Sequence, residues 1–308
     1  MDNLTKKLYI LTDADQIYQE LIEKLALPNL IITNQRNEAD ILLAAPPRLA
    51  TQLDDFTNMT WVQSTYAGVD ALINHRLRQD YLLTNVKGIF GQQIAEYVLG
   101  FTIEHYRHFK QYQQQQTDKQ WQPAQYQCLN SKTLAIVGTG QIGTHLAQVA
   151  KAFAMRTIGI NTSGIPKAGA PFDETYHVDE LASAIAQSDI VVNTLPDTAR
   201  TRGLFNQAAF ATAKNILLFN VGRGSSIDQT ALLDALNHDK IEHAFLDVFE
   251  QEPLSAEHPY WSHPKITITP HIAALSFPEQ VVDIFTQHYI NWEQGYTLHD
   301  CIDFSKGY

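Results

Sequence analysis

Residues 133–153 read TLAIVGTGQIGTHLAQVAKAF, and this stretch decides the fold. An apolar run leads into Gly138, Gly140 and Gly143, and a run with helical spacing follows. Glycines so spaced permit a tight turn, a close approach of the backbone to a pyrophosphate and close packing of the helix on the strand, while the helix N-terminus stabilises the anion. We therefore predict a dinucleotide-binding turn in preference to a merely structural one. Its expected cofactor-binding residues are Gly138, Thr139, Gly140, Gln141, Ile142 and Gly143.

Short β-branched runs alternate with helical segments on both sides of this turn, which is typical of parallel sheets covered by helices. A flavodoxin-like series comes first, with a helix at 15–25 and strands at 8–12, 30–33, 41–44, 61–64 and 82–86. The dinucleotide-binding sheet is expected to have six strands, at 133–137, 157–160, 190–194, 216–220, 243–247 and 266–269. We predict an α/β protein with two doubly wound parallel-sheet domains, one flavodoxin-like and one of the Rossmann type, and a cleft between them.

Two long helical segments are expected to connect the domains. Residues 92–112 have helical periodicity and run into the polar stretch QYQQQQTDKQWQPAQYQ (111–127), which we interpret as a solvated helix end and loop. Residues 279–293 are amphipathic and are expected to return to the first domain, which is then discontinuous. The predicted boundaries are 1–95 with 275–308 for the substrate domain, and 96–274 for the NAD(P)-binding domain.

The composition indicates a cytoplasmic globular protein. Of 308 residues, 44% are hydrophobic and 18% are charged, which is enough apolar material for two cores. The formal net charge of -11 argues against nucleic-acid or anionic-membrane partners, because both require cationic side chains. Two cysteines, Cys128 and Cys301, are too few for a disulfide scaffold and fit a reducing compartment. No signal peptide and no run of about 18 apolar residues is evident, so we expect an unexported protein without a membrane partner.

Three ionisable residues follow the carboxyl ends of late strands, where open α/β sheets bind their ligands. They are Arg223, Glu252 and His271. Hydride transfer to a keto carbon leaves an alkoxide that needs a proton, and a histidine has a suitable pKa for that task. A carboxylate favours the protonated imidazole, and a guanidinium binds a substrate carboxylate in a planar fork. We therefore expect His271 to act as general acid and base, Glu252 to support it, and Arg223 to bind the substrate.

The end of the second strand in the nucleotide-binding domain bears on the choice of cofactor. A carboxylate there pairs with the ribose 2′-OH and repels a 2′-phosphate, but this chain has Asn161. The following Thr162 and Ser163 can donate hydrogen bonds and Lys167 can supply a cation, although no arginine is present in this loop. We expect NADP or NAD to bind, with NADP favoured, because the determinant against the 2′-phosphate is missing.

At Asn161 the chain resembles the NADP-accepting glyoxylate/hydroxypyruvate reductase branch of the D-isomer-specific 2-hydroxyacid dehydrogenase family, and seven motifs make it resemble that family over nearly its whole length. They are STYAGVDAL (64–72), IAEYVLG (94–100), IVGTGQIG (136–143), TLPDTARTRGLFN (194–206), FNVGRGSSID (219–228), LDVFEQEPL (246–254) and ITPHIAA (268–274). The resemblance implies a catalytic set at Arg223, Glu252 and His271. It also implies a homodimer formed through the cofactor domain.

The same resemblance implies further ligand contacts. The implied cofactor contacts are Leu195, Pro196, Val221 beside the nicotinamide ring, and Asp247 on the carboxamide. The implied substrate contacts, in addition to Arg223, are the backbone N–H groups around Ala67, Gly68 and Val69.

Two other functions stay open. A catalytically weak NAD(P)-sensing protein of the corepressor type would bind cofactor without turnover, whereas a different Rossmann enzyme would lack this combination of motifs. Neither His105 and His108 with Glu104 nor His258 with His263 offers a complete ligand set, so no metal site is expected. The physiological acid also stays open among glyoxylate, hydroxypyruvate, pyruvate and bulkier 2-keto acids, because pocket shape decides selectivity.

Overall fold

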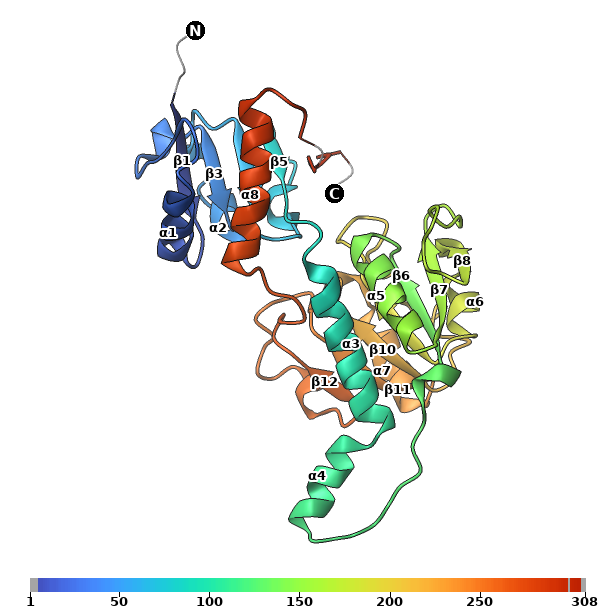
Figure 1. Ribbon diagram of the computed structural model, residues 1–308. Coiled ribbons are helices and arrows are strands. Elements are labelled where there is room, and N and C mark those ends of the chain that lie inside the picture. Colours follow the sequence, from blue (N-terminus) through green and yellow to red (C-terminus); the bar gives the residue numbers. More distant parts are fainter. Residues whose placement is uncertain (1–4, 299, 306–308) are drawn as a thin grey trace. The chain divides into compact units, whose positions relative to one another are not determined.

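The computed structural model describes residues 5–298 and 300–305 (Figure 1). The chain divides into two compact units: the first contains the residues up to Ile89 and those from Ser276 onward, and the second contains Phe90–Leu275. The chain passes from the first unit to the second at Phe90, which is earlier than the expected boundary at residue 95. The reason is that Phe90 begins one continuous helix that packs within the second unit. Residues 1–4, 299 and 306–308, which belong to the predicted first domain, lie outside the described residues.

The first unit contains a five-stranded parallel sheet of order β2-β1-β3-β4-β5. Its strands are β1 (Lys6–Leu11), β2 (Leu30–Ile32), β3 (Ile41–Ala44), β4 (Trp61–Ser64) and β5 (Leu82–Thr84). Its helices are α1 (Asp15–Leu25), α2 (Pro46–Ala50) and α8 (Pro278–Glu293), with 3₁₀ turns η1 (Arg36–Glu38), η2 (Leu53–Asp55) and η3 (Asp70–Leu72). The predicted flavodoxin-like strands and both predicted helices are therefore confirmed, with shifts of one or two residues at some ends.

Aromatic packing anchors the returning helix α8 on this sheet. Trp61 of β4 is fully buried, and its ring stacks on Phe285 of α8 with centroids 5.5 Å apart. Its indole N–H donates to Thr84 Oγ1 of β5 at 2.8 Å, which satisfies the polar atom of an otherwise apolar side chain. Helix α8 also packs against α1. The segment from Ser276 onward thus contributes core residues to a unit whose other part is Met1–Ile89.

The second unit contains a seven-stranded parallel sheet of order β12-β11-β10-β9-β6-β7-β8. Its strands are β6 (Thr133–Val137), β7 (Arg156–Asn161), β8 (Glu174–His177), β9 (Ile190–Asn193), β10 (Ile216–Asn220), β11 (Ile241–Leu246) and β12 (Ile266–Ile268). Its helices are α3 (Phe90–Tyr106), α4 (Phe109–Thr117), α5 (Gln141–Ala152), α6 (Leu181–Ile185) and α7 (Gln229–Asn237). Short 3₁₀ turns complete it: η4 (Leu129–Ser131), η5 (Val178–Glu180), η6 (Gly224–Ser226) and η7 (Pro259–Ser262).

Two details of this unit differ from the sequence prediction. The expectation of six strands was wrong, because Glu174–His177 adds a seventh strand beside β7. That strand lies at the sheet edge with no buried residue, so it lacks the apolar signal by which a strand is found in a sequence. The single helix expected over 92–112 is divided into α3 and α4, because His108 takes the left-handed conformation with a φ of 57°.

Apolar side chains bury both faces of the second sheet. One face packs against α3 and α5, where Gly91 lets the two helices approach so closely that a Cβ there would lie 2.7 Å from His145 Cβ. The other face packs against α6 and α7. Phe219 and Phe245 stack between neighbouring strands at 4.5 Å. Within the described residues, no helix is both long and apolar enough to cross a membrane.

Candidate active site

Backbone atoms pack closely within the glycine turn that follows β6. Gly138 has a φ of 107°, and a Cβ at Gly143 would lie 2.0 Å from the Gly138 carbonyl oxygen, so a side chain at either position would strain the turn. A Cβ at Gly140, the N-cap of α5, would meet open space, and no side chain caps this helix end in the described structure. The first N–H groups of α5 therefore have room for an anion, and the turn fits a pyrophosphate.

The loop after β7 is organised by the side chain of Asn161. Its Oδ1 accepts from the N–H groups of Ser163 and Gly164 at 3.0 and 2.7 Å, and its Nδ2 donates to Thr139 Oγ1 at 3.1 Å. Thr162 and Ser163 are exposed beside it. Asn161 thus ties this loop to the glycine turn and leaves no carboxylate at the strand end that would repel a 2′-phosphate.

The imidazole of His271 and the carboxyl group of Glu252 form a hydrogen-bonded pair. The imidazole Nδ1 lies 2.7 Å from Glu252 Oε2, and Glu252 Oε1 accepts from the Phe249 N–H at 2.8 Å. The hydrogen bond to Glu252 raises the pKa of His271 above its usual value, against an opposing effect of burial. Burial opposes ionisation of Glu252, but the hydrogen bonds from His271 and Phe249 outweigh it and lower the pKa of this carboxyl. The pair therefore favours a protonated imidazole with a fixed orientation.

The segment that carries His271 is folded around the buried carboxylate of Asp247. Asp247 Oδ1 accepts from Thr269 Oγ1 at 2.6 Å and from the Ile272 N–H at 2.8 Å, and Oδ2 accepts from the Ala273 N–H at 3.0 Å. The His271 N–H donates to the Asp247 carbonyl at 2.9 Å. These bonds hold His271 at a φ of 55°, a conformation that costs a non-glycine residue about 1 kcal/mol or more.

Arg223 lies on a loop that packs directly against the loop carrying Glu252. A Cβ at the next residue, Gly224, would lie 1.9 Å from the Phe249 carbonyl carbon, so only glycine permits this contact. Arg223 Nη1 donates to the Gly222 carbonyl at 2.8 Å. The positive charge of Arg223 helps to lower the pKa of Glu252 and opposes the rise in the pKa of His271. The three residues predicted as the catalytic set therefore lie close enough for their charges to influence one another.

The remaining predicted cofactor contacts lie at the same edge of the sheet. Leu195 and Pro196 follow β9, and Val221 follows β10. A Cβ at Gly222 would lie 2.6 Å from the Leu195 carbonyl oxygen, so these two loops are in direct backbone contact. Because all strands are parallel, the glycine turn, Asn161 and the catalytic set also follow carboxyl ends of strands. Such an edge is where open α/β sheets bind ligands.

The predicted substrate-binding loop belongs to the first unit. It follows β4, where the Asn85 Nδ2 group donates to the Ala67 carbonyl at 2.6 Å, and the Leu72 N–H donates to the Val69 carbonyl at 2.8 Å. Gly68 is partly exposed between them. The carbonyl groups of Ala67 and Val69 thus accept hydrogen bonds that stabilise the conformation of this loop.

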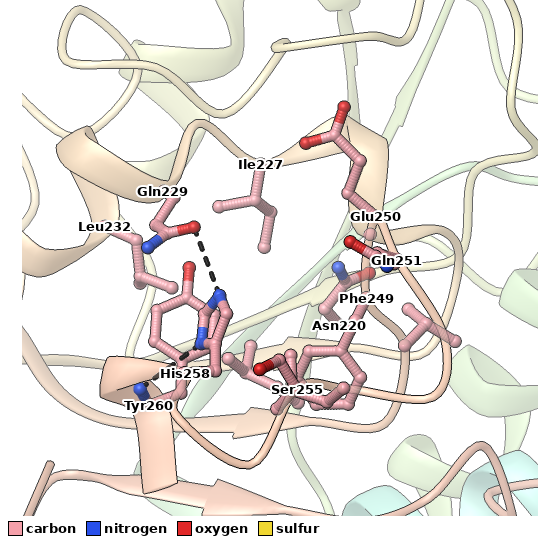
Figure 2. Close-up of a pocket in the computed structure, with 14 residues that line it drawn as sticks. Asn220, Ile227, Gln229, Leu232, Phe249, Glu250, Gln251, Ser255, His258 and Tyr260 are labelled. Carbon is pink, nitrogen blue, oxygen red and sulfur yellow. Dashed lines mark hydrogen bonds between the residues drawn. The ribbon is translucent and has the colours of Figure 1, made fainter. Parts of the chain in front are cut away.

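A cavity of about 340 Å³ lies beside the loops that carry Arg223 and Glu252, between the start of α7 and the segment after β11 (Figure 2). Figure 2 shows Gln229 and His258 side by side in its lining, with 3.3 Å between Oε1 and Nε2. Its lining includes Gly224, Glu250 and Gln251 but none of the three predicted catalytic residues, and it contains no lysine or arginine. We therefore do not assign it to the nucleotide.

Sequence reasoning missed the residues that support the His271 segment. Thr269 and Tyr97 share a hydrogen bond of 2.7 Å, and Gln93 bonds to the backbone of Leu275. For two of these residues the sequence offered a signal: Tyr97 stands in the IAEYVLG motif, and Thr269 stands in ITPHIAA. Three histidines outside the site have other partners in the described structure: His105 bonds Glu242, His108 bonds the Gln125 carbonyl, and His263 accepts from the Lys265 N–H.

A Rossmann-type sheet, a glycine turn suited to a pyrophosphate and a carboxylate-supported histidine at the same sheet edge define an NAD(P)-dependent oxidoreductase. Residues 99–273 match the family model described as D-isomer specific 2-hydroxyacid dehydrogenase, NAD binding domain. The chain belongs to the D-isomer specific 2-hydroxyacid dehydrogenase family, as its motifs predict.

Known relatives agree with this membership. A glyoxylate/hydroxypyruvate reductase A from Serratia proteamaculans is 32% identical over 252 residues, which cover 79% of each chain. A crystal structure of a D-isomer specific 2-hydroxyacid dehydrogenase family protein from Aeromonas salmonicida is 41% identical, with a TM-score of 0.92 over 97% of this chain and 99% of that one. A glyoxylate/hydroxypyruvate reductase from Sinorhizobium meliloti, described as NADPH-dependent and crystallised with NADP and sulfate, is 25% identical, with a TM-score of 0.85 over 98% and 100% of the two chains.

Proposed function

We propose that this enzyme reduces a small 2-keto acid to the D-2-hydroxy acid, with glyoxylate and hydroxypyruvate as the first substrates to test. The observation that carries the proposal is the 2.7 Å pair of His271 and Glu252, at the same sheet edge as a glycine turn that fits a dinucleotide. The names of the Serratia and Sinorhizobium relatives supply the two substrates. The second unit is the cofactor domain in this proposal, and the first unit is the substrate domain.

His271 provides the proton in the proposed reaction. When bound, the reduced nicotinamide supplies a hydride to the keto carbon, and negative charge develops on the carbonyl oxygen. Imidazolium stabilises this charge and then donates its proton to the oxygen. Glu252 keeps the imidazole protonated before the step and holds the ring so that its other nitrogen is available to the substrate.

Arg223 binds the substrate carboxylate in this proposal. Its guanidinium offers parallel N–H donors that match the two oxygens of a carboxylate, and its charge also polarises the neighbouring carbonyl. Backbone N–H groups around Ala67, Gly68 and Val69 complete the binding of the carboxylate. The cofactor contacts are assigned to Gly138–Gly143, Asn161–Ser163, Leu195, Pro196, Val221 and Asp247.

A spectrophotometric assay tests the function directly. Oxidation of NADPH and of NADH is followed at 340 nm, the absorbance band of reduced nicotinamide, with glyoxylate, hydroxypyruvate, pyruvate and a branched 2-keto acid. The product is analysed for its configuration. We expect turnover with at least one small acid and a D product wherever a stereocentre forms. Tight NADPH binding without turnover of any acid would favour the sensing protein of the corepressor type.

Asn161→Asp is expected to change the choice of cofactor. We expect NADPH to be preferred in the wild type, because Asn161, Thr162 and Ser163 present no carboxylate to a 2′-phosphate. A carboxylate at residue 161 would repel the phosphate, and the ratio of kcat/KM for NADPH to that for NADH should fall roughly tenfold at this partly exposed position. Asn34→Asp, in an exposed loop of the first unit, is the matched control. A wild-type preference for NADH would contradict the assignment.

Glu252→Gln is expected to move the pH profile of reduction toward lower pH. The reaction needs protonated His271, so kcat/KM is constant at pH values below the pKa of His271 and falls at pH values above it. Glu252 raises that pKa, and the neutral amide removes the main cause of the shift. The basic limb of the kcat/KM profile, measured over about pH 5 to 9, should therefore move toward the ordinary histidine value. An unmoved limb would exclude His271 as the group that titrates.

We further propose a cytoplasmic homodimer formed through the second unit. Exposed aromatic side chains gather on α4 and the segment after it, at Phe109, Tyr112, Trp121 and Tyr126, and Trp121 is 98% exposed. A contiguous set of this kind is typical of an interface. Cys128 and Cys301 are exposed free thiols, which fits a reducing compartment. Sedimentation of the full chain measures the oligomeric state, and a monomer at micromolar concentration would contradict the dimer.

A further inference from the structure

Helix α3 contacts both ends of the segment that carries His271. Tyr97 OH lies 2.7 Å from Thr269 Oγ1 at the start of this segment. Gln93, one helical turn earlier, bonds Leu275 at its end: Nε2 donates to the Leu275 carbonyl at 3.0 Å, and Oε1 accepts from the Leu275 N–H at 2.8 Å. Residues four apart lie on the same face of a helix, so one face of α3 supplies both contacts.

The proton inventory fixes the direction of the Tyr97 bond. Thr269 has a single hydroxyl proton, and it donates this proton to the Asp247 carboxylate, which can only accept when ionised. Tyr97 must therefore be the donor to Thr269. Burial raises the pKa of Tyr97, so its hydroxyl keeps its proton. Tyr97, Thr269 and Asp247 thus form a directed chain that ends on the carboxylate around which the His271 segment is folded.

The Gln93 contact uses a different chemistry. A glutamine amide carries one acceptor and a donor group at the spacing of a peptide group, so it pairs with both backbone atoms of a single residue. Leu275 is the last residue of the second unit before the chain passes to the first, and its side chain is exposed. Between the two contacts, Ala273 is buried in the same core cluster as Ile94 and Val98 of α3. The segment is thus held at its start and its end by one helix, and its middle is buried in the core cluster to which that helix contributes.

We propose that Gln93 and Tyr97 are positioning residues for His271, which together clamp residues 269–275 so that the imidazole stays within hydrogen-bond reach of Glu252. The inference rests on the proposed role of His271 as the acid. His271 needs such support because its backbone lies in the left-handed region and its side chain is half exposed, so local packing does not hold the ring. The charged groups that act on the imidazole are Glu252, Asp247 and Arg223. If residues 269–275 were held less firmly, the contact of the imidazole with Glu252 would weaken.

The variants Tyr97→Phe, Gln93→Ala and the double variant test the clamp. Each single change is expected to lower kcat/KM for the keto acid roughly tenfold, because a small misplacement of a catalytic group has a large effect on rate. The Kd for NADPH and the melting temperature should stay close to the wild-type values. Two controls on α3 keep the clamp intact. Gln92→Ala removes bonds to Glu96 of α3 and to His145 of α5, and Tyr106→Phe removes a hydroxyl at the end of α3.

A titration of His271 distinguishes positioning from a purely structural role. Its ring signal is assigned by NMR through comparison with the spectrum of His271→Asn, and it is titrated without substrate. In the clamp variants we expect the His271 pKa to fall toward its ordinary value, and the basic limb of the kcat/KM profile to move with it. Clamp variants that titrate and turn over like the wild type would overturn the proposal. Because the NMR titration does not require turnover, it tests the clamp even if the proposed reaction fails.

Discussion

Replacing His271 with asparagine is expected to lower kcat/KM for reduction of glyoxylate by NADPH roughly 10³-fold, while NADPH still binds. An amide cannot donate a proton to an alkoxide near neutral pH, and loss of a positioned general acid typically costs 10²- to 10⁴-fold. Asparagine is the replacement of choice because His271 has a φ of 55°, a conformation that asparagine tolerates better than most residues. The measurements are steady-state kinetics and the Kd for NADPH from its fluorescence.

His238→Asn is the matched control for this experiment. His238 is exposed at the C-cap of α7, where its ring bonds the Asp234 carbonyl, so the same chemical change is made away from the proposed site. We expect the control to keep wild-type kinetics. If His271→Asn also did so, the general acid would have to be another residue. If it lost NADPH binding as well, the segment would support the cofactor and the kinetic result would say nothing about proton transfer.

The strands of both sheets could be predicted because their central members are buried on both faces. A run such as ILLFN at 216–220 is apolar at nearly every position, and this signal does not depend on the rest of the fold. The edge strand β8 gives no such signal, since the ETYH sequence is polar and its residues are at most half-buried. Its strand conformation is supplied by pairing with β7, which is a tertiary contact.

Likewise, one part of the candidate site could be predicted from the sequence and another part could not. Arg223, Glu252 and His271 could be found from the sequence because each follows the end of a predicted strand, and parallel strands bring such ends to one edge. What the sequence could not show is how the residues between them are used. The carboxylate of Asp247, for which the resemblance implies a cofactor contact, accepts three hydrogen bonds from its own chain. The contact of Gln93 with Leu275 joins residues 182 positions apart, and no local pattern indicates it.

Arg223→Lys is expected to lower kcat/KM for the keto acid roughly 10²-fold, chiefly through a higher KM. The variant keeps the positive charge, so it separates the effect of charge from that of geometry. An ammonium cannot make two parallel hydrogen bonds to a carboxylate. Loss of one hydrogen bond to a charged group costs about 1.5–3 kcal/mol, which is a factor of about ten to a hundred or more in kcat/KM. The KM for NADPH should change little.

Arg36→Lys is the control for this substitution, because Arg36 forms an exposed ion pair with Asp55 in the first unit, and surface pairs contribute little. A second test uses Arg223→Ala with added guanidinium ion. If the guanidinium group itself binds the substrate carboxylate, the added ion should restore part of the lost activity, whereas ammonium at the same ionic strength should not. Wild-type kinetics in Arg223→Lys would mean that charge alone suffices at this position, and the two-pronged contact would have to be abandoned.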